Sequence, residues 1–127
     1  MTLKHGDILH AYCAFIPDYK YVVCICSKTP LFFLINSKPR KSTPDAQVII
    51  EKKEFPFLDH DSYINTATII TIYPNEINKA KEIGYLSKIK KAEIVKIVKQ
   101  CGYLTPKYKE LIENNFQGWT CGTYISL

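Results

Sequence analysis

The sequence has no uninterrupted apolar run approaching the roughly twenty residues that a helix needs to cross a bilayer. The N-terminal residues MTLKHGD include no apolar stretch of the signal-peptide kind. The five cysteines form no CxxC pair and have no histidines at the spacing of a zinc site, which favours buried, reduced thiols over a disulfide framework. These absences predict a cytoplasmic protein that has no membrane partner and uses no metal or cofactor.

The composition is that of an ordinary globular protein, with 46% hydrophobic and 23% charged residues. We expect the 127 residues to form a single domain. The formal charge of +5 is unevenly placed, because residues 81–127 hold eight lysines against four acids. Such asymmetry permits contact with an anionic partner, of which nucleic acid is the commonest. A solvated, lysine-rich helix face is the alternative reading.

Short apolar and β-branched runs, separated by turn residues, predict strands at residues 8–16, 21–25, 31–35, 47–50 and 62–73. Both faces of the first run are apolar, as in a strand covered on both sides. The last run is the longest, and we expect a bend near Asn65 or Thr66. Cys24 and Cys26, two apart in strand-like sequence, are expected to point to one face of the core.

Helices are predicted near residues 75–83, 88–101 and 106–116. Pro74 and Gly84 bracket the first, Ser87 is a good N-cap for the second, and Thr105 with Pro106 opens the third. Residues 85–86 are expected to add a last short strand. The sequence therefore predicts an α+β, mainly β fold, a small barrel of about five to seven strands with two or three C-terminal helices.

A charged triplet, Asp59, His60 and Asp61, lies between an apolar hook at residues 55–58 and the longest predicted strand. A histidine between carboxylates can serve as a general acid or base near neutral pH. With His5 or His10 it could also bind a divalent metal, as in a metal-dependent hydrolase. The alternative is a structural turn, because aspartate commonly caps turns.

Lys38, Arg40 and Lys41 form a cationic loop that could steer a phosphate, or could simply be solvated. His10 lies in an apolar strand and is interpreted as a core or edge histidine. Several aromatic side chains could stack bases on a barrel face or serve only packing: Tyr12, Tyr19, Tyr21 and Phe32.

Three segments together resemble one family: GDI at residues 6–8, KYVVCI at residues 20–25 and IGYLSKIKKAEIVKIVKQ at residues 83–100. Their order is similar to that of the PemK/MazF-like proteins, SH3-like barrels best known as the toxins of toxin–antitoxin pairs. The block FPFLDHDSYI at residues 55–64 resembles a phage-type branch of the PemK-like proteins. The resemblance spans nearly the whole predicted barrel and implies an SH3-like fold.

The resemblance implies metal-independent cleavage of single-stranded RNA, in which a neighbouring 2′-hydroxyl attacks the phosphate. By position, the family's arginine falls on Lys20 and its hydroxyl residue on Asn36 or Ser37. Lysine carries the charge but lacks the planar fork of arginine, and asparagine cannot transfer a proton. The expected catalytic set is therefore Lys20, Ser37 and His60, with Lys38, Arg40, Lys41 and Tyr21 binding RNA and Asp59 and Asp61 nearby.

The same resemblance implies a homodimer and a protein partner, either antitoxin-like or a host factor. A different function is open at this point: a non-catalytic binding module that kept the barrel and binds a protein or a nucleic acid. The C-terminal residues 117–127, which include Trp119, are aromatic and β-branched, and we expect them to dock on the domain or on a partner.

Overall fold

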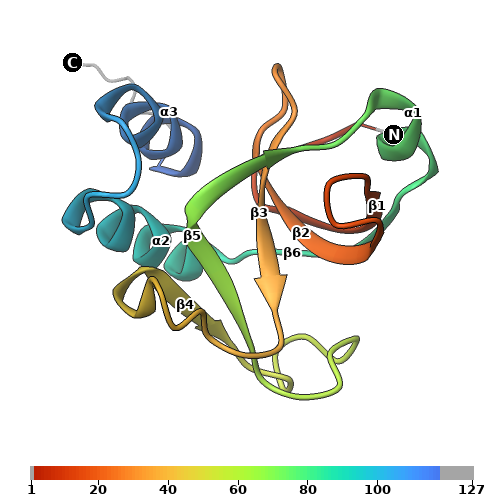
Figure 1. Ribbon diagram of the computed structural model, residues 1–127, viewed down its shortest axis with the longest axis horizontal. Helices are drawn as coiled ribbons and strands as arrows, with labels where there is room; N and C mark the ends of the chain where they lie inside the picture. Colours follow the sequence, from red (N-terminus) through yellow and green to blue (C-terminus); the bar gives the residue numbers. More distant parts are fainter. Residues whose placement is uncertain (1, 118–127) are drawn as a thin grey trace.

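The computed structural model describes residues 2–117. Its fold is α+β and mainly β: a curled, six-stranded antiparallel sheet forms a half-barrel, accompanied by two long helices and a short one (Figure 1). The strands are β1 (Asp7–Cys13), β2 (Asp18–Cys26), β3 (Leu31–Asn36), β4 (Gln47–Ile50), β5 (Ser62–Thr71) and β6 (Lys81–Tyr85). The helices are a 3-10 turn η1 (Pro44–Ala46), α1 (Pro74–Lys79), α2 (Lys88–Gln100) and α3 (Pro106–Gln117).

The strand order is β4-β5-β3-β2-β1-β6, and every neighbouring pair is antiparallel. In the β1–β2 hairpin His10 pairs with Tyr21, and at the end of β3 Asn36 pairs with Tyr63 of β5. The start of β2, the end of β3 and the start of β5 therefore meet at one end of the sheet. In residues 2–117, no helix is long and apolar enough to span a membrane.

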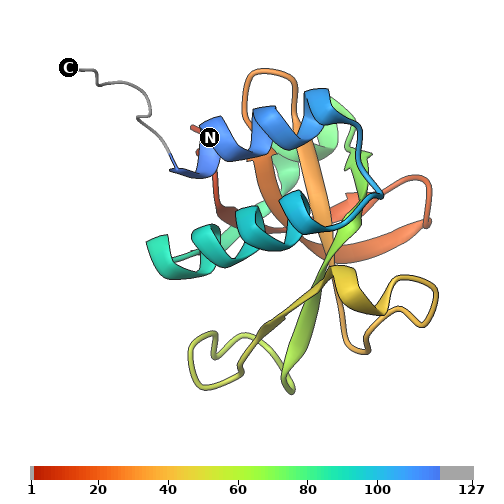
Figure 2. The same ribbon diagram turned by 90° about the vertical axis from the view of Figure 1, so that its left-hand side faces the viewer.

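Both faces of the sheet are buried, as the apolar pattern of the first strand predicts. Ile8, Val23 and Phe33 belong to one core cluster, and Leu9 and Val22 belong to a second cluster across the strands. Helices α2 and α3 pack side by side over the first cluster, contributing the buried side chains Ile94, Val95, Val98, Ile112 and Phe116 (Figure 2). The exposed positions of the sheet include the start of β2 and several residues of the edge strand β6.

The cysteine prediction is half right. The four cysteines of the described residues are free and buried, and burial raises the pKa of the Cys24 thiol to about 12, so this thiol is inert. However, Cys24 and Cys26 do not share a face, because a β-bulge between them shifts the register with β3. The bulge places Cys24 in one core cluster and Cys26 in the other.

The predicted helix at residues 75–83 is wrong in its second half. Helix α1 ends at Lys79, and the backbone of Ala80 is already extended, with ψ of 153°. The following residues form β6, which pairs with β1 through Ile8 and Gly84. Gly84 therefore lies within a strand and does not end a helix. Tertiary pairing with a strand at the other end of the chain overrides the local helix signal.

The other helix predictions and the bend of the longest strand are confirmed. Ser87 caps α2, since its side-chain oxygen accepts from the backbone N–H of Lys90 at 3.1 Å. In β5 the register against β3 is broken between the partners of Leu34 and Phe32, which are Asn65 and Ile70. The C-terminal residues 118–127, including Trp119, lie outside the described part of the chain.

Candidate functional site

A pocket of about 200 Å³ lies at the end of the sheet where β2 begins, β3 ends and β5 begins. The long loop between β4 and β5 forms its other wall, next to the tip of β3 (Figure 1). Six residues of the expected RNA site line this pocket together: Lys20, Tyr21, Asn36, Ser37, Asp59 and His60. The expected catalytic residues Lys20, Ser37 and His60 thus come from three distant segments into one hollow.

Four other candidates lie elsewhere. Lys38 and Lys41 are exposed on the loop after β3 and do not line the pocket. Arg40 lines a different pocket. The side chain of Asp61 is taken up by the backbone, because its Oδ1 accepts from the N–H of Lys52 at 2.9 Å. Asp61 therefore fits the structural-turn interpretation of the triplet better than a catalytic one.

Three hydrogen bonds fix the segment that carries His60. Besides its bond to Asp61, Lys52 donates from Nζ to the Leu58 carbonyl at 2.7 Å. The Ser62 hydroxyl donates to the His60 carbonyl at 3.1 Å, which ties the segment to the first residue of β5. Lys52 thus holds both sides of residues 58–61. The loop presents His60 from a fixed backbone although the side chain is exposed.

One contact of the His60 imidazole indicates which nitrogen carries the hydrogen in the neutral ring. Its Nδ1 lies 3.0 Å from the carbonyl oxygen of Asp61. A carbonyl can only accept, so Nδ1 carries the hydrogen and the neutral ring keeps a free lone pair on Nε2. A ring held in this way is set up to take a proton at Nε2. A free lone pair of this kind is one of the conditions that a general base must meet.

Aromatic side chains form a ladder along one wall. The His10 ring lies 5.4 Å from Tyr19 and 5.0 Å from Tyr21, and Tyr21 lies 5.0 Å from Phe57 of the hook. The Tyr21 hydroxyl also donates to the Phe57 carbonyl at 3.5 Å. Tyr21 therefore anchors the loop to β2. Tyr19, with 59% of its surface exposed, is the ring in this ladder that is free to stack on a ligand.

The remaining aromatic candidates differ in burial and in their contacts. Phe32 is fully buried, so the suggestion that it stacks bases is wrong. Tyr12 packs edge-on against Tyr19, with the ring centroids 5.4 Å apart. His10, for which the sequence predicts a core or edge position, is a half-buried member of the pocket wall. Its place follows from the pairing with Tyr21, which the local sequence does not reveal.

Lys20 lies near the start of β2, at the end of the sheet where the pocket opens. Side chains alternate along β2, so Lys20 is directed to the strand face opposite to that of Tyr19 and Tyr21. It is half-buried and still lines the pocket, because the pocket opens at the end of the strands. Next to it, Nδ2 of Asn36 is buried and has no hydrogen-bond partner among the described residues. An unpaired buried donor of this kind is costly, about 1–3 kcal/mol, and would gain from an incoming acceptor.

No group of three or more histidine, cysteine or acidic side chains within residues 2–117 is arranged to hold a metal ion. In particular, the triplet does not gather with His5 or His10 into such a group. His5 instead lies 3.2 Å from the Ser27 hydroxyl, measured at Nε2. The arrangement therefore gives no support to the metal-dependent hydrolase.

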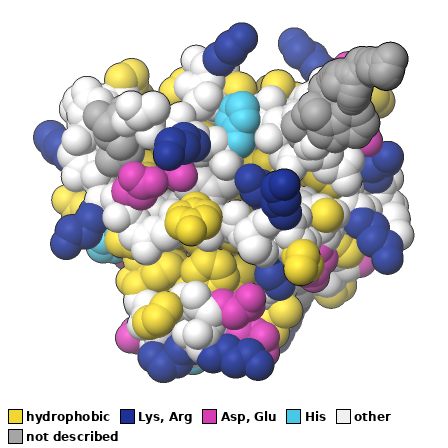
Figure 3. Space-filling model, turned by 180° about the vertical axis from the view of Figure 1, so that it is seen from behind, with side chains coloured by type: hydrophobic (Ala, Val, Ile, Leu, Met, Phe, Trp, Pro, Cys, Tyr) yellow, Lys and Arg dark blue, Asp and Glu magenta, His cyan; other side chains and the backbone are white. Residues whose placement is uncertain are grey.

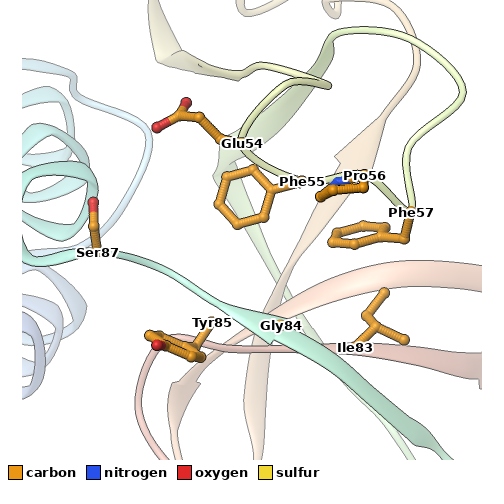
Figure 4. Close-up of a pocket in the computed structure, with 8 residues that line it drawn as sticks. All are labelled: Glu54, Phe55, Pro56, Phe57, Ile83, Gly84, Tyr85 and Ser87. Carbon is orange, nitrogen blue, oxygen red and sulfur yellow. The ribbon is translucent and has the colours of Figure 1, made fainter.

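A separate apolar hollow of about 350 Å³ lies between the hook and β6. The Phe55 and Phe57 rings stand over Gly84, and Tyr85 forms the far side (Figure 4). Seen from behind, hydrophobic side chains gather in the lower centre of the molecule, and lysines and arginines are scattered over the same face (Figure 3). This hollow contains none of the candidate catalytic residues.

A scan against models of known protein families finds no match for the chain, and a search of curated protein sequences finds none either. The resemblance to PemK/MazF-like proteins therefore stays a prediction that depends on the three sequence segments.

Proposed function

We propose that this protein acts on single-stranded RNA as a metal-independent endoribonuclease of the PemK/MazF type. The observation that supports the proposal is that Lys20, Ser37 and His60 line one pocket although they are distant in sequence. A volume of about 200 Å³ is below the range of pockets that enclose whole drug-sized ligands. It suits a phosphate and its ribose better than a complete nucleotide.

In the proposed reaction the ribose 2′-hydroxyl attacks the adjacent phosphorus. Nε2 of His60 takes the proton of the attacking hydroxyl, as the Nδ1–H tautomer of the ring allows. The O2′–P bond forms, the P–O5′ bond breaks, and the 5′-oxygen leaves as an alcohol after accepting a proton from water. The Lys20 ammonium offsets the negative charge that develops on the phosphate, and the Ser37 hydroxyl donates to a phosphate oxygen. The products are a 2′,3′-cyclic phosphate and a 5′-hydroxyl.

A binding module without catalysis is the second candidate, and the position of Lys20 favours it. Lys20 is directed to the strand face opposite to Tyr19, and as a lysine it offers a point charge in place of a bidentate fork. An ammonium that binds the phosphate without reaching the developing charge would retain RNA and leave it intact. The resemblance further implies a homodimer and an antitoxin-like or host-factor partner for either candidate.

The test is incubation of the full chain with mixed single-stranded RNA in EDTA, followed by analysis of the RNA ends. Cyclic-phosphate ends are expected, and Lys20→Ala or Ser37→Ala should slow their formation by about 100-fold to 1,000-fold. Lys53→Ala is the control, because Lys53 lies on the β4–β5 loop that also carries His60, its side chain is 78% exposed, and it lies outside the pocket. RNA that stays intact but bound at high protein concentration would replace the endoribonuclease with the binding module.

A further inference from the structure

An unassigned pocket of about 400 Å³ lies on the other face of β3. Phe15 and Ile16 of the β1–β2 turn form one wall, and Leu34 of β3 with Ile70 of β5 forms the floor. Arg40 comes from the loop after β3, and this loop and the β1–β2 turn project on the same side of the sheet (Figure 2). No acidic side chain is among the residues that line this pocket.

Lys20 connects the two pockets, because it lines the smaller one and pairs with Ala11, two residues before Cys13 of the larger one. Leu34 lines the larger pocket and Ile35 the smaller one, and neighbours in a strand point to opposite faces. Burial raises the pKa of the Cys13 thiol in the larger pocket, and the nearby charge of Lys20 opposes that rise. Lys20 therefore lines the smaller pocket, and its pairing with Ala11 directs its side chain to the sheet face on which Cys13 and the larger pocket lie. A phosphate bound by Lys20 would lie between the two hollows.

The larger pocket has an apolar side that suits a base and a cationic side that suits a phosphate. Phe15 has 74% of its surface exposed, so its ring is open for stacking, and Leu34, Ile69 and Ile70 provide an apolar floor. Arg40 supplies a guanidinium at the rim, and arginine is suited to grip phosphate oxygens at two points. A volume of about 400 Å³ lies within the usual range for small-ligand pockets, unlike the smaller site.

One acid, Asp18, lies beside this pocket, because it pairs with Cys13 across β1 and β2. Asp18 begins β2, and its Oδ1 accepts from the backbone N–H of Tyr19 at 2.8 Å. Asp18 keeps its negative charge in this bond, but Arg40 is the charged side chain among the residues that line the larger pocket, so the lining itself is positive. This charge balance favours an anionic ligand with a flat apolar part over a neutral or acidic peptide.

We propose that this pocket binds the base of the nucleotide that adjoins the phosphate held by Lys20. Phe15 stacks on this base, and Arg40 binds the phosphate of the same nucleotide. The inference rests on the proposed action on single-stranded RNA and adds a base subsite to it. It assigns a role to Phe15, which lies outside the small pocket, and it separates Arg40 from the cations that merely surround the site.

The first test measures binding of a fluorescent, 2′-O-methyl RNA hexamer of mixed sequence by anisotropy, since a 2′-O-methyl group blocks the attack. Phe15→Ala should weaken binding between about 5-fold and about 150-fold, the range for loss of one base stack. Tyr85→Ala is the matched control: Tyr85 is also 74% exposed, and it lies on β6 away from this pocket. Equal affinity of the Phe15 and Tyr85 variants would overturn the subsite.

An abasic scan identifies the contact. Removal of the base at one position of the hexamer should weaken binding by the same factor as Phe15→Ala. The Phe15→Ala protein should bind this abasic hexamer as weakly as the wild-type protein does. Arg40→Gln should lower the salt dependence of binding by about 0.7 in log–log slope, and Lys53→Gln should leave it unchanged. Unchanged slopes for Arg40→Gln would refute the phosphate contact.

The failure of the subsite and of the function are distinguishable. If the wild-type chain binds the hexamer and Lys20→Ala weakens that binding, but Phe15→Ala and Arg40→Gln do not, the subsite is wrong and the function survives. If the wild-type chain does not bind the hexamer, both are wrong. Binding of an acidic peptide that is sensitive to Phe15→Ala, without RNA binding, would assign the pocket to a protein partner instead.

Discussion

Replacing His60 with alanine tests the proposed chemistry most sharply. The His60 side chain is exposed, and its backbone carbonyl, not its ring, receives the bond from Ser62. Surface substitutions of this kind change the free energy of unfolding by at most about 0.5 kcal/mol. Loss of a general base, in contrast, slows a reaction by about 100-fold to 10,000-fold, which corresponds to about 2.7–5.4 kcal/mol of barrier. Activity should therefore fall steeply in a protein of unchanged stability.

Free imidazole provides the decisive control for this variant. The Asp61 carbonyl that accepts from Nδ1 of His60 stays in place after truncation, so an added imidazole can bind there and present its other nitrogen. RNA cleavage by His60→Ala, followed by quantification of cyclic-phosphate ends, should recover in part as imidazole is added. A His60→Ala protein that cleaves RNA at the wild-type rate would refute the reasoning.

Three further predictions follow from the same structure. Asp61→Ala removes the acceptor for the Lys52 N–H and should slow cleavage by about 10-fold to 100-fold through misplacement of His60, whereas Asp61→Asn keeps an acceptor and should restore the rate. Phe33→Ala empties a fully buried core position and should lower the free energy of unfolding in urea by about 3–5 kcal/mol, in contrast to the exposed Phe15→Ala. Burial and the charge of Lys91 lower the pKa of His5, so the unfolded state takes up the proton at a higher pH than the folded state. The free energy of unfolding should therefore decline as the pH falls below 6.5, the ordinary pKa of histidine. A series of urea titrations at different pH values should show that His5→Asn flattens this decline.

Much of the sheet was predictable from the sequence because the signals are local. Short apolar and β-branched runs predicted the strands, and the β5 bend fell where polar Asn65 and Thr66 interrupt the run. The failures share one cause, which is pairing between distant segments. Residues 81–85 became a strand because β1 offered an edge, and Cys24 and Cys26 separated because a bulge formed against β3.

The candidate site was predictable by residue type and less so by geometry. The sequence singled out Lys20, Ser37 and His60, which share a pocket, but it could not show that Asp61 serves the Lys52 backbone. It also grouped Arg40 with Lys38 and Lys41 as neighbours in the chain. In the folded sheet, Arg40 instead lines the larger pocket together with Phe15 and Ile16 of the β1–β2 turn. Such assignments need the register of the folded sheet.

One measurement tests the central claim most directly: a backbone amide NMR titration of the full chain with a 2′-O-methyl single-stranded RNA. The account predicts that the largest shift changes occur at Lys20, Ser37 and His60, the residues that line the small pocket from separate segments. Changes confined to the hollow between the hook and β6, or no change at saturating RNA, would contradict it.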